Sequence, residues 1–135
     1  MSVLVDTSVW SLALRRMRPP DDAVVHELRQ LVAKGSALMM GPIRQEILSG
    51  IRSPRQFETL RDGLRAFPDL LLHGADYEEA ATFFNRCRAR GIQGSNTDFL
   101  VCAVAARRRL TIFTTDRDFV EYARVLPLRL HRPRG

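Results

Sequence analysis

Short apolar runs alternate along this chain with longer stretches whose apolar residues recur every three or four positions. The runs predict buried strands at 2–5, 37–40, 70–72, 111–113 and 126–130. The periodic stretches predict amphipathic helices at 9–14, 24–32, 41–51, 55–65, 76–90 and 96–106, with a short helix after Asp118. Because strands that alternate with helices form βαβ crossovers, we expect an α/β fold. Its central parallel sheet of four or five strands would be flanked by helices on both faces.

The length of 135 residues suits a single domain. We assign 1–131 to that domain and 132–135 to a short basic tail, because the chain has no repeat and no internal linker. No apolar run approaches the roughly 18 residues of a membrane span, and Asp6 interrupts the opening run too early for a secretory signal. With only Cys87 and Cys102 available, we expect two buried, reduced thiols in a cytoplasmic protein.

The net charge is +6, and Lys34 is the only lysine among 21 basic residues. Arginine makes forked contacts to phosphate groups, so the composition suits a polyanionic partner, although an arginine-rich genome produces the same bias. The arginines cluster at 15–18, 86–90, 107–109 and 129–134. Each cluster alone is typical of a solvated helix end, whereas together they would form a basic rim for the phosphates of a polyanion.

Four carboxylates follow, or lie close to, the carboxyl ends of the predicted strands, where open parallel sheets bind ligands. Asp6 directly follows the first strand, and Asp116 lies two residues after Thr114 beyond the fourth. Glu46 and Asp98 fall in the early turns of two helices, among apolar positions. Each alone has a structural explanation: a helix cap for Asp6, a solvated position for Glu46, a favourable helix dipole for Asp98 and a turn for Asp116.

Together the four carboxylates predict a shared site. Crowded carboxylates repel one another and raise one another's pKa unless a cation neutralises them. Hard oxygen ligands without a histidine favour Mg²⁺ or Mn²⁺ over zinc. The sequence therefore predicts a divalent metal site at one edge of the sheet.

At these residues the chain resembles the PIN-domain ribonucleases, and within them the VapC-type toxins of bacterial toxin–antitoxin pairs. The resemblance covers nearly the whole chain and rests on four fragments: Val3-Leu4-Val5-Asp6-Thr7-Ser8-Val9-Trp10, Glu46-Ile47-Leu48-Ser49-Gly50, Asp98-Phe99-Leu100-Val101-Cys102-Ala103-Val104-Ala105 and Thr114-Thr115-Asp116-Arg117-Asp118-Phe119. Each fragment alone is weakly specific, but all four in this order are strongly specific. One departure is the turn at 94–97, which offers no family-specific helper residue.

The resemblance implies a metal-dependent endoribonuclease that uses Mg²⁺ or Mn²⁺. The family's acidic set carries over onto Asp6, Glu46, Asp98 and Asp116, its polar helper onto Thr114, and a less regular acidic position onto Asp118. Asp6 and Asp116 are the first-choice metal ligands. Glu46 and Asp98 would be further ligands, would orient a water, or would act as a base.

The resemblance also implies three partners: an RNA substrate, a cognate antitoxin and a second copy of the chain in a homodimer. In the family an antitoxin peptide lies in an apolar groove on the side of the early helices. The apolar residues that this chain places there are Trp10, Leu14, Ile43, Ile47, Leu48 and Leu60. We expect most of them to belong to the core, and the pattern does not separate groove positions from core positions.

Two other classes of enzyme also place an aspartate after the first strand. A haloacid-dehalogenase-like phosphatase needs a second aspartate two residues later, where this chain has Ser8, and a lysine that Lys34 is poorly placed to supply. A phospho-accepting receiver domain needs an acidic pair at the first strand and a lysine near the end, and both are missing. The remaining alternative is a PIN-like module that binds RNA or a protein without cutting, which has no reason to keep four costly carboxylates.

Overall fold

The computed structural model describes residues 2–15 and 21–133. Its elements are β1 (Val3–Val5), α1 (Thr7–Leu14), α2 (Ala23–Ala33), β2 (Ala37–Leu38), α3 (Gly41–Leu48), α4 (Pro54–Leu64), α5 (Gly74–Ala89), α6 (Asn96–Arg108), β3 (Thr111–Phe113) and α7 (Asp118–Ala123). Every predicted helix is therefore present, with ends that differ from the prediction by at most three residues. Positions 16–18 of the first arginine cluster and positions 134–135 of the predicted tail lie outside the described residues.

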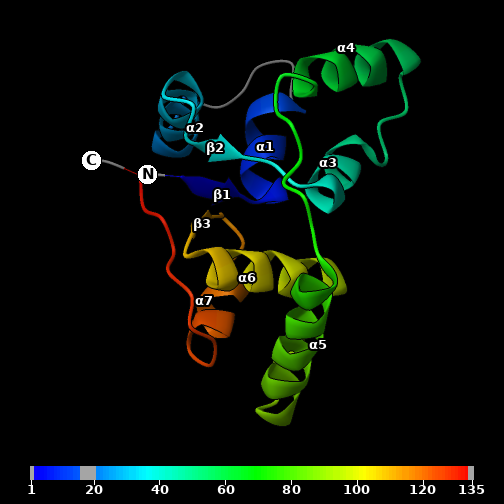
Figure 1. Ribbon diagram of the computed structural model, residues 1–135. Coiled ribbons are helices and arrows are strands. Elements are labelled where there is room, and N and C mark those ends of the chain that lie inside the picture. The colour runs from blue at the N-terminus through cyan, green and yellow to red at the C-terminus, as the bar shows by residue number, and fades with distance from the viewer. Residues whose placement is uncertain (1, 16–20, 134–135) are drawn as a thin grey trace.

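The three strands form one parallel sheet in the order β2-β1-β3. Val3 of the central strand pairs with Ala37 on one side, and Val5 pairs with Phe113 on the other. All of β1 is buried, as expected for a strand that helices cover. Figure 1 shows the sheet in the middle of the molecule, between α1–α4 and α5–α7. The predicted α/β fold, with a parallel sheet flanked by helices, is confirmed.

The outer two predicted strands contribute less to the sheet than the sequence pattern indicates. Asp69 pairs with Met39, and Leu130 pairs with Ile112, each as a single parallel bridge. The segment at 70–72 has little length for pairing because α5 begins at Gly74. The segment at 126–130 starts with a tight turn, in which Leu128 N donates to Leu126 O at 2.8 Å, so only its last residues run beside β3.

Side chains next to the helix starts explain where the helices begin. Ser95 and Ser53 cap α6 and α4 through their hydroxyls, which accept hydrogen bonds from backbone N–H groups three residues later. Helix α5 begins two residues earlier than expected, because the Asp76 carboxylate reaches back to accept the His73 N–H at 2.8 Å. At its other end Gly91, with a φ of +78°, provides the left-handed turn that closes α5.

Helices α5 and α6 are joined by a buried ion group centred on Asp76. The Asp76 side chain is fully buried and receives Arg107 Nη1 at 2.5 Å and Arg108 Nη2 at 3.0 Å. Burial by itself would raise the pKa of Asp76, but the hydrogen bonds from His73, Arg107 and Arg108 outweigh it and lower that pKa. Two members of the 107–109 arginine cluster therefore hold the fold together.

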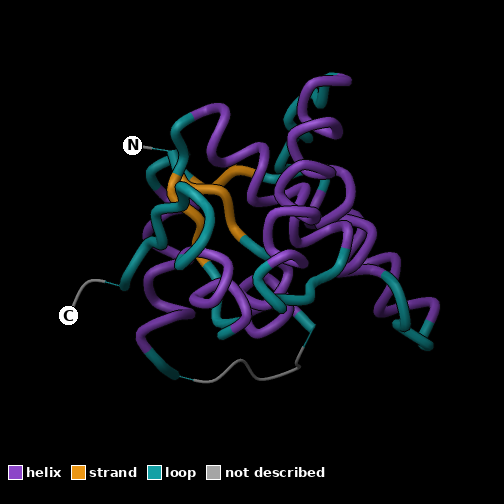
Figure 2. Tube along the Cα trace, turned by 90° about the horizontal axis from the view of Figure 1, so that it is seen from below, coloured by secondary structure: helices purple, strands orange, loops and turns teal. Residues whose placement is uncertain are grey.

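A second buried pair fastens the C-terminal segment. His131 Nε2 lies 2.5 Å from Glu27 Oε2, which joins the end of the described chain to α2. The His131 ring also meets the Phe113 ring edge-on, at 5.2 Å between centroids. Figure 2 shows the strands lying together with helices around them. None of the helices at 2–15 and 21–133 is long and apolar enough to span a membrane.

Candidate metal and nucleic-acid site

Asp6 leaves the central strand and is almost fully buried, with 5% of its surface exposed. It occupies the N-cap position of α1, yet its side chain caps no helix N–H. Instead Asp6 Oδ2 accepts hydrogen bonds from Ser8 Oγ at 2.9 Å and from Thr114 Oγ1 at 2.8 Å. Two hydroxyl groups from distant parts of the chain thus fix the orientation of this carboxylate, while Asp6 caps α1 only through its backbone carbonyl, which accepts the Val9 and Trp10 N–H groups.

The loop after β3 folds back on the start of α1. Thr115 N donates to Ser8 Oγ at 3.0 Å, and Asp116 N donates to Thr114 Oγ1 at 3.0 Å. Asp116 Oδ1 in turn accepts the Asp118 N–H at 2.9 Å, which is the turn role expected of an aspartate at this position. Thr114 therefore connects the backbone of the loop to the Asp6 carboxylate.

Asp98 lies in the first turn of α6, where Ser95 caps the helix and fixes its backbone. The Tyr122 hydroxyl donates a 2.7 Å hydrogen bond to Asp98 Oδ2. Burial raises the pKa of Asp98 and the Tyr122 hydrogen bond lowers it, while the charges of Asp6 and Asp116 raise it further, so the net direction is upward. Burial, followed by the interaction with Asp98, raises the pKa of Tyr122, so the phenol remains a donor at neutral pH.

Three of the carboxylates form a compact group. One oxygen from each of Asp98, Asp116 and Asp118 lies within 4.8 Å of the other two. Such closely spaced oxygens repel one another, and they match the hard donors that Mg²⁺ and Mn²⁺ prefer. Cys102, one turn beyond Asp98, is fully buried, and burial raises the pKa of its thiol, which leaves it neutral. The donor set therefore fits a hard divalent cation.

Asp98 and Asp116 of this group line a cleft of about 580 Å³. Its lining residues are Asp6, Thr7, Ser8, Pro42, Gln45, Glu46, Ser49, Thr97, Asp98 and Asp116. Glu46 lies on α3, and its Oε1 accepts a 2.6 Å hydrogen bond from Thr7 Oγ1 of α1. It is exposed, although the sequence pattern placed it among apolar residues. All four predicted carboxylates thus line one cleft, while their metal-binding and catalytic roles remain a prediction.

Sequence reasoning missed several neighbours of these carboxylates. Ser8 and Thr7 carry a weak signal, because they directly follow Asp6 in the chain. Tyr122 carries none, because the spacing of 24 residues to Asp98 corresponds to no local motif. Only the packing of α7 against α6 reveals it.

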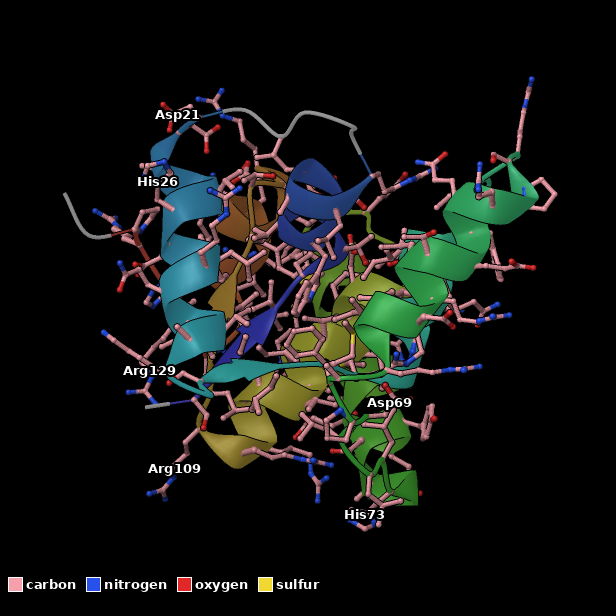
Figure 3. All side chains as sticks on the ribbon, turned by 90° about the horizontal axis from the view of Figure 1, so that it is seen from above. Asp21, His26, Asp69, His73, Arg109 and Arg129 are labelled. Atoms are coloured by element: carbon pink, nitrogen blue, oxygen red, sulfur yellow. The ribbon has the colours of Figure 1, made fainter. Side chains whose placement is uncertain are left out.

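The predicted basic rim is only partly available to RNA. Arg107 and Arg108 are bound to Asp76. Figure 3 shows Arg109 and Arg129 together at one edge of the molecule, where Arg129 Nη2 donates to Arg109 O at 3.2 Å. Arg107 and Arg108 thus serve a structural contact, which neither the solvated helix end nor the basic rim anticipated.

A second, apolar groove of about 990 Å³ runs between α1, α2 and α4. Trp10, Leu14 and Leu60 line it, as do Leu28 and Phe67. Of the other residues that the sequence placed on this side, Ile43 and Ile47 are fully buried in the core, and Leu48 packs against it. The groove is distinct from the carboxylate cleft.

A family model described as PIN domain matches residues 3–125. The chain belongs to the PIN-domain family. The membership predicted from the four sequence fragments is therefore confirmed. The matched range includes every carboxylate of the cleft and the whole parallel sheet. A search of curated proteins gives no match.

Solved structures share the fold of this PIN domain along almost its whole length. FitAcB from Neisseria gonorrhoeae superposes with a TM-score of 0.77 at 20% identity, over 97% of each chain. VapBC2 from Rickettsia felis, bound to a DNA fragment from their promoter, gives a TM-score of 0.77 at 17% identity, over 97% of this chain and 98% of that chain. VapBC-5 from Mycobacterium tuberculosis is described as a member of the VapBC family of toxin–antitoxin systems. It gives a TM-score of 0.69 at 18% identity, over 97% of this chain and 98% of that chain. At these identities the similarity shows a common fold.

Proposed function

We propose that this PIN domain is a metal-dependent endoribonuclease and the toxin of a toxin–antitoxin pair. The observation that supports the activity most directly is the convergence of carboxylates from four distant segments on one cleft. A protein that only binds RNA gains nothing from holding negative groups beside a phosphate backbone. When the carboxylates hold a divalent cation, the positive charge of the cation attracts the RNA phosphates that the bare carboxylates would repel.

Asp98, Asp116 and Asp118 would hold Mg²⁺ or Mn²⁺, because their oxygens are already close together. Asp6 would complete the ligand set from the buried side of the cleft. When bound, such an ion supplies activation of a water and stabilisation of charge at the scissile phosphate. Glu46, which also lines the cleft, would orient that water or accept its proton, and its carboxylate accepts a hydrogen bond from the Thr7 hydroxyl.

RNA cleavage by the purified chain tests this function. The chain would be incubated with total RNA in Mg²⁺ or Mn²⁺, and the new RNA ends would be sequenced. We expect cleavage that excess chelator stops and that Asp116→Asn abolishes. The matched control is Asp62→Asn, which removes an exposed carboxylate from α4 that is paired with Arg61. RNA binding without cleavage, in the wild type and with either metal, would instead support the non-catalytic module.

The toxin role is supported by the structural neighbours, which are described as toxin–antitoxin complexes or members of such systems. The apolar groove between α1, α2 and α4 would receive an amphipathic segment of the cognate antitoxin. Arg29 and Arg55 also line the groove and would pair with acidic groups of that segment. The toxin would act in the cytoplasm on cellular RNA, and we expect a homodimer by analogy with the family.

A further inference from the structure

We propose that Tyr122 is a positioning residue, whose hydroxyl holds the Asp98 carboxylate in the orientation that binds the divalent cation. The inference rests on the proposed function, because it takes Asp98 as a metal ligand. It concerns a side chain that belongs to none of the four sequence fragments. Tyr122 itself lies outside the cleft and contributes no oxygen to the carboxylate group.

The geometry gives the Tyr122 hydroxyl a single direction. Its ring is fully buried and packs against Phe99 at 4.9 Å and Phe119 at 5.1 Å between centroids. The phenol oxygen meets Asp98 Oδ2 at 2.7 Å. A carboxylate that is held through one oxygen presents the other without rotating, and outer partners of this kind orient metal ligands in many proteins.

A close approach of the backbone at Gly94 also confines the phenol. A Cβ atom added at Gly94 would lie 2.3 Å from Tyr122 Oη and 2.9 Å from Phe99 Cε2. Only a residue without a side chain therefore fits between the loop at 91–95 and the tip of the ring. The sequence showed no family helper residue in this turn, and the structure shows that its Gly94 closes over the hydroxyl instead.

The same carboxylate is fixed from its own helix as well. Ser95 Oγ accepts the Asp98 N–H at 3.0 Å, which sets the first turn of α6. Asp98 thus has its backbone set by Ser95 and its side chain set by Tyr122. Asp116 lies on the loop after β3 and Asp118 is the first residue of α7, whereas Asp98 is held through its backbone within α6 and through its side chain from α7.

Two variants disturb the hydroxyl in different ways. Tyr122→Phe removes the oxygen but keeps the ring contacts, whereas Gly94→Ala keeps the oxygen and displaces it from its present position. The matched controls are Tyr77→Phe, which alters a tyrosine that is 54% exposed, and Gly74→Ala, whose added Cβ meets nothing within 4 Å. Each full-length variant would be titrated with Mn²⁺ by calorimetry, and its melting temperature without metal would be recorded.

We expect both test variants to bind Mn²⁺ about tenfold more weakly than the wild type, the size of effect typical of lost outer partners. Tyr122→Phe should regain the wild-type cleavage rate at high Mn²⁺, which Asp98→Asn should not. Unchanged Mn²⁺ affinity in Tyr122→Phe would overturn the positioning role, as would a rate that saturating Mn²⁺ fails to restore. If the wild type itself binds no Mn²⁺, the proposed function fails first, and this inference fails with it.

Discussion

Thr114 Oγ1 donates a 2.8 Å hydrogen bond to Asp6 Oδ2 across 108 residues of sequence. The same oxygen accepts the Asp116 N–H at 3.0 Å, so one hydroxyl connects the buried Asp6 carboxylate to the loop that carries Asp116 and leads into α7. Thr114 therefore fixes the distance between Asp6 and the loop after β3.

Replacing Thr114 with valine keeps the shape of the side chain and removes both hydrogen bonds. We expect RNA cleavage to fall by about 10- to 100-fold, as for other lost partners of metal ligands. The valine should fit the strand end, so the far-ultraviolet circular dichroism spectrum should not change. Thr82→Val, on the exposed surface of α5, is the matched control. Equal cleavage rates for the two variants would exclude an organising role for Thr114.

Asp98→Asn should separate stability from activity. The folded-state pKa of Asp98 is raised, chiefly by burial, so the folded protein holds a proton on it more readily than the unfolded chain does. Its charged form therefore destabilises the metal-free fold at neutral pH, and that penalty disappears as the pH falls through the folded pKa. We expect Asp98→Asn to raise the metal-free melting temperature at pH 7 while it abolishes cleavage. A lower melting temperature would show that the charge is compensated.

Asp76→Asn should have the opposite effect on stability. It leaves Arg107 and Arg108 without their buried partner, and because both guanidinium groups are partly solvated we expect a cost of about 1–3 kcal/mol of unfolding free energy. The measurement is urea unfolding at pH 7. An exposed-pair variant, Glu121→Gln, removes the partner of Arg124 and should cost less than about 1 kcal/mol.

The lowered pKa of Asp76 also predicts how the unfolding free energy depends on pH. Because the pKa of Asp76 is lowered from 3.8 in the fold, the ionised group stabilises the protein fully above the unfolded value. That contribution is lost as the pH falls through the folded pKa. Unfolding free energies measured from pH 6 downwards should therefore converge for the wild type and Asp76→Asn in acid. A constant difference between them at all pH values would contradict this assignment.

A substitution in the apolar groove should weaken antitoxin binding without affecting RNA cleavage. Leu14 is 39% exposed and lines the groove, so Leu14→Asp should preserve the core while placing a charge where an apolar segment would lie. We expect at least a tenfold weaker affinity for the cognate antitoxin in a calorimetric titration, with RNA cleavage unchanged. Val120→Asp is the matched control, because Val120 is exposed on α7, outside the groove.

The sequence predicted the fold well because its apolar runs and periodic stretches are distinct from each other. It overestimated the strand at 126–130, because an apolar run does not reveal the tight turn at Leu126. It also placed α5 too late, since the reach of Asp76 back to His73 depends on side-chain geometry.

For the site, the order of strands brought Asp6 and Asp116 together by a general rule of parallel sheets. Asp118 remained a secondary candidate on sequence grounds, although the structure groups it with Asp98 and Asp116. Which carboxylates of a loop face the same point depends on turn geometry. The sequence could not predict the hydrogen-bond partner of Asp98 either, because Tyr122 lies on a different helix.

The dependence of Asp6 on Thr114 also has a consequence for how such a protein is made. Asp6 and Glu46 of the cleft come before α5 in the chain, whereas Asp98 and Asp116 come after it. A nascent chain that has emerged only as far as α5 therefore contains β1, β2 and helices α1–α5 but no assembled site. Domains fold as units once their residues have left the ribosome. The proposed nuclease activity would therefore begin only after α6 and the loop after β3 have been synthesised.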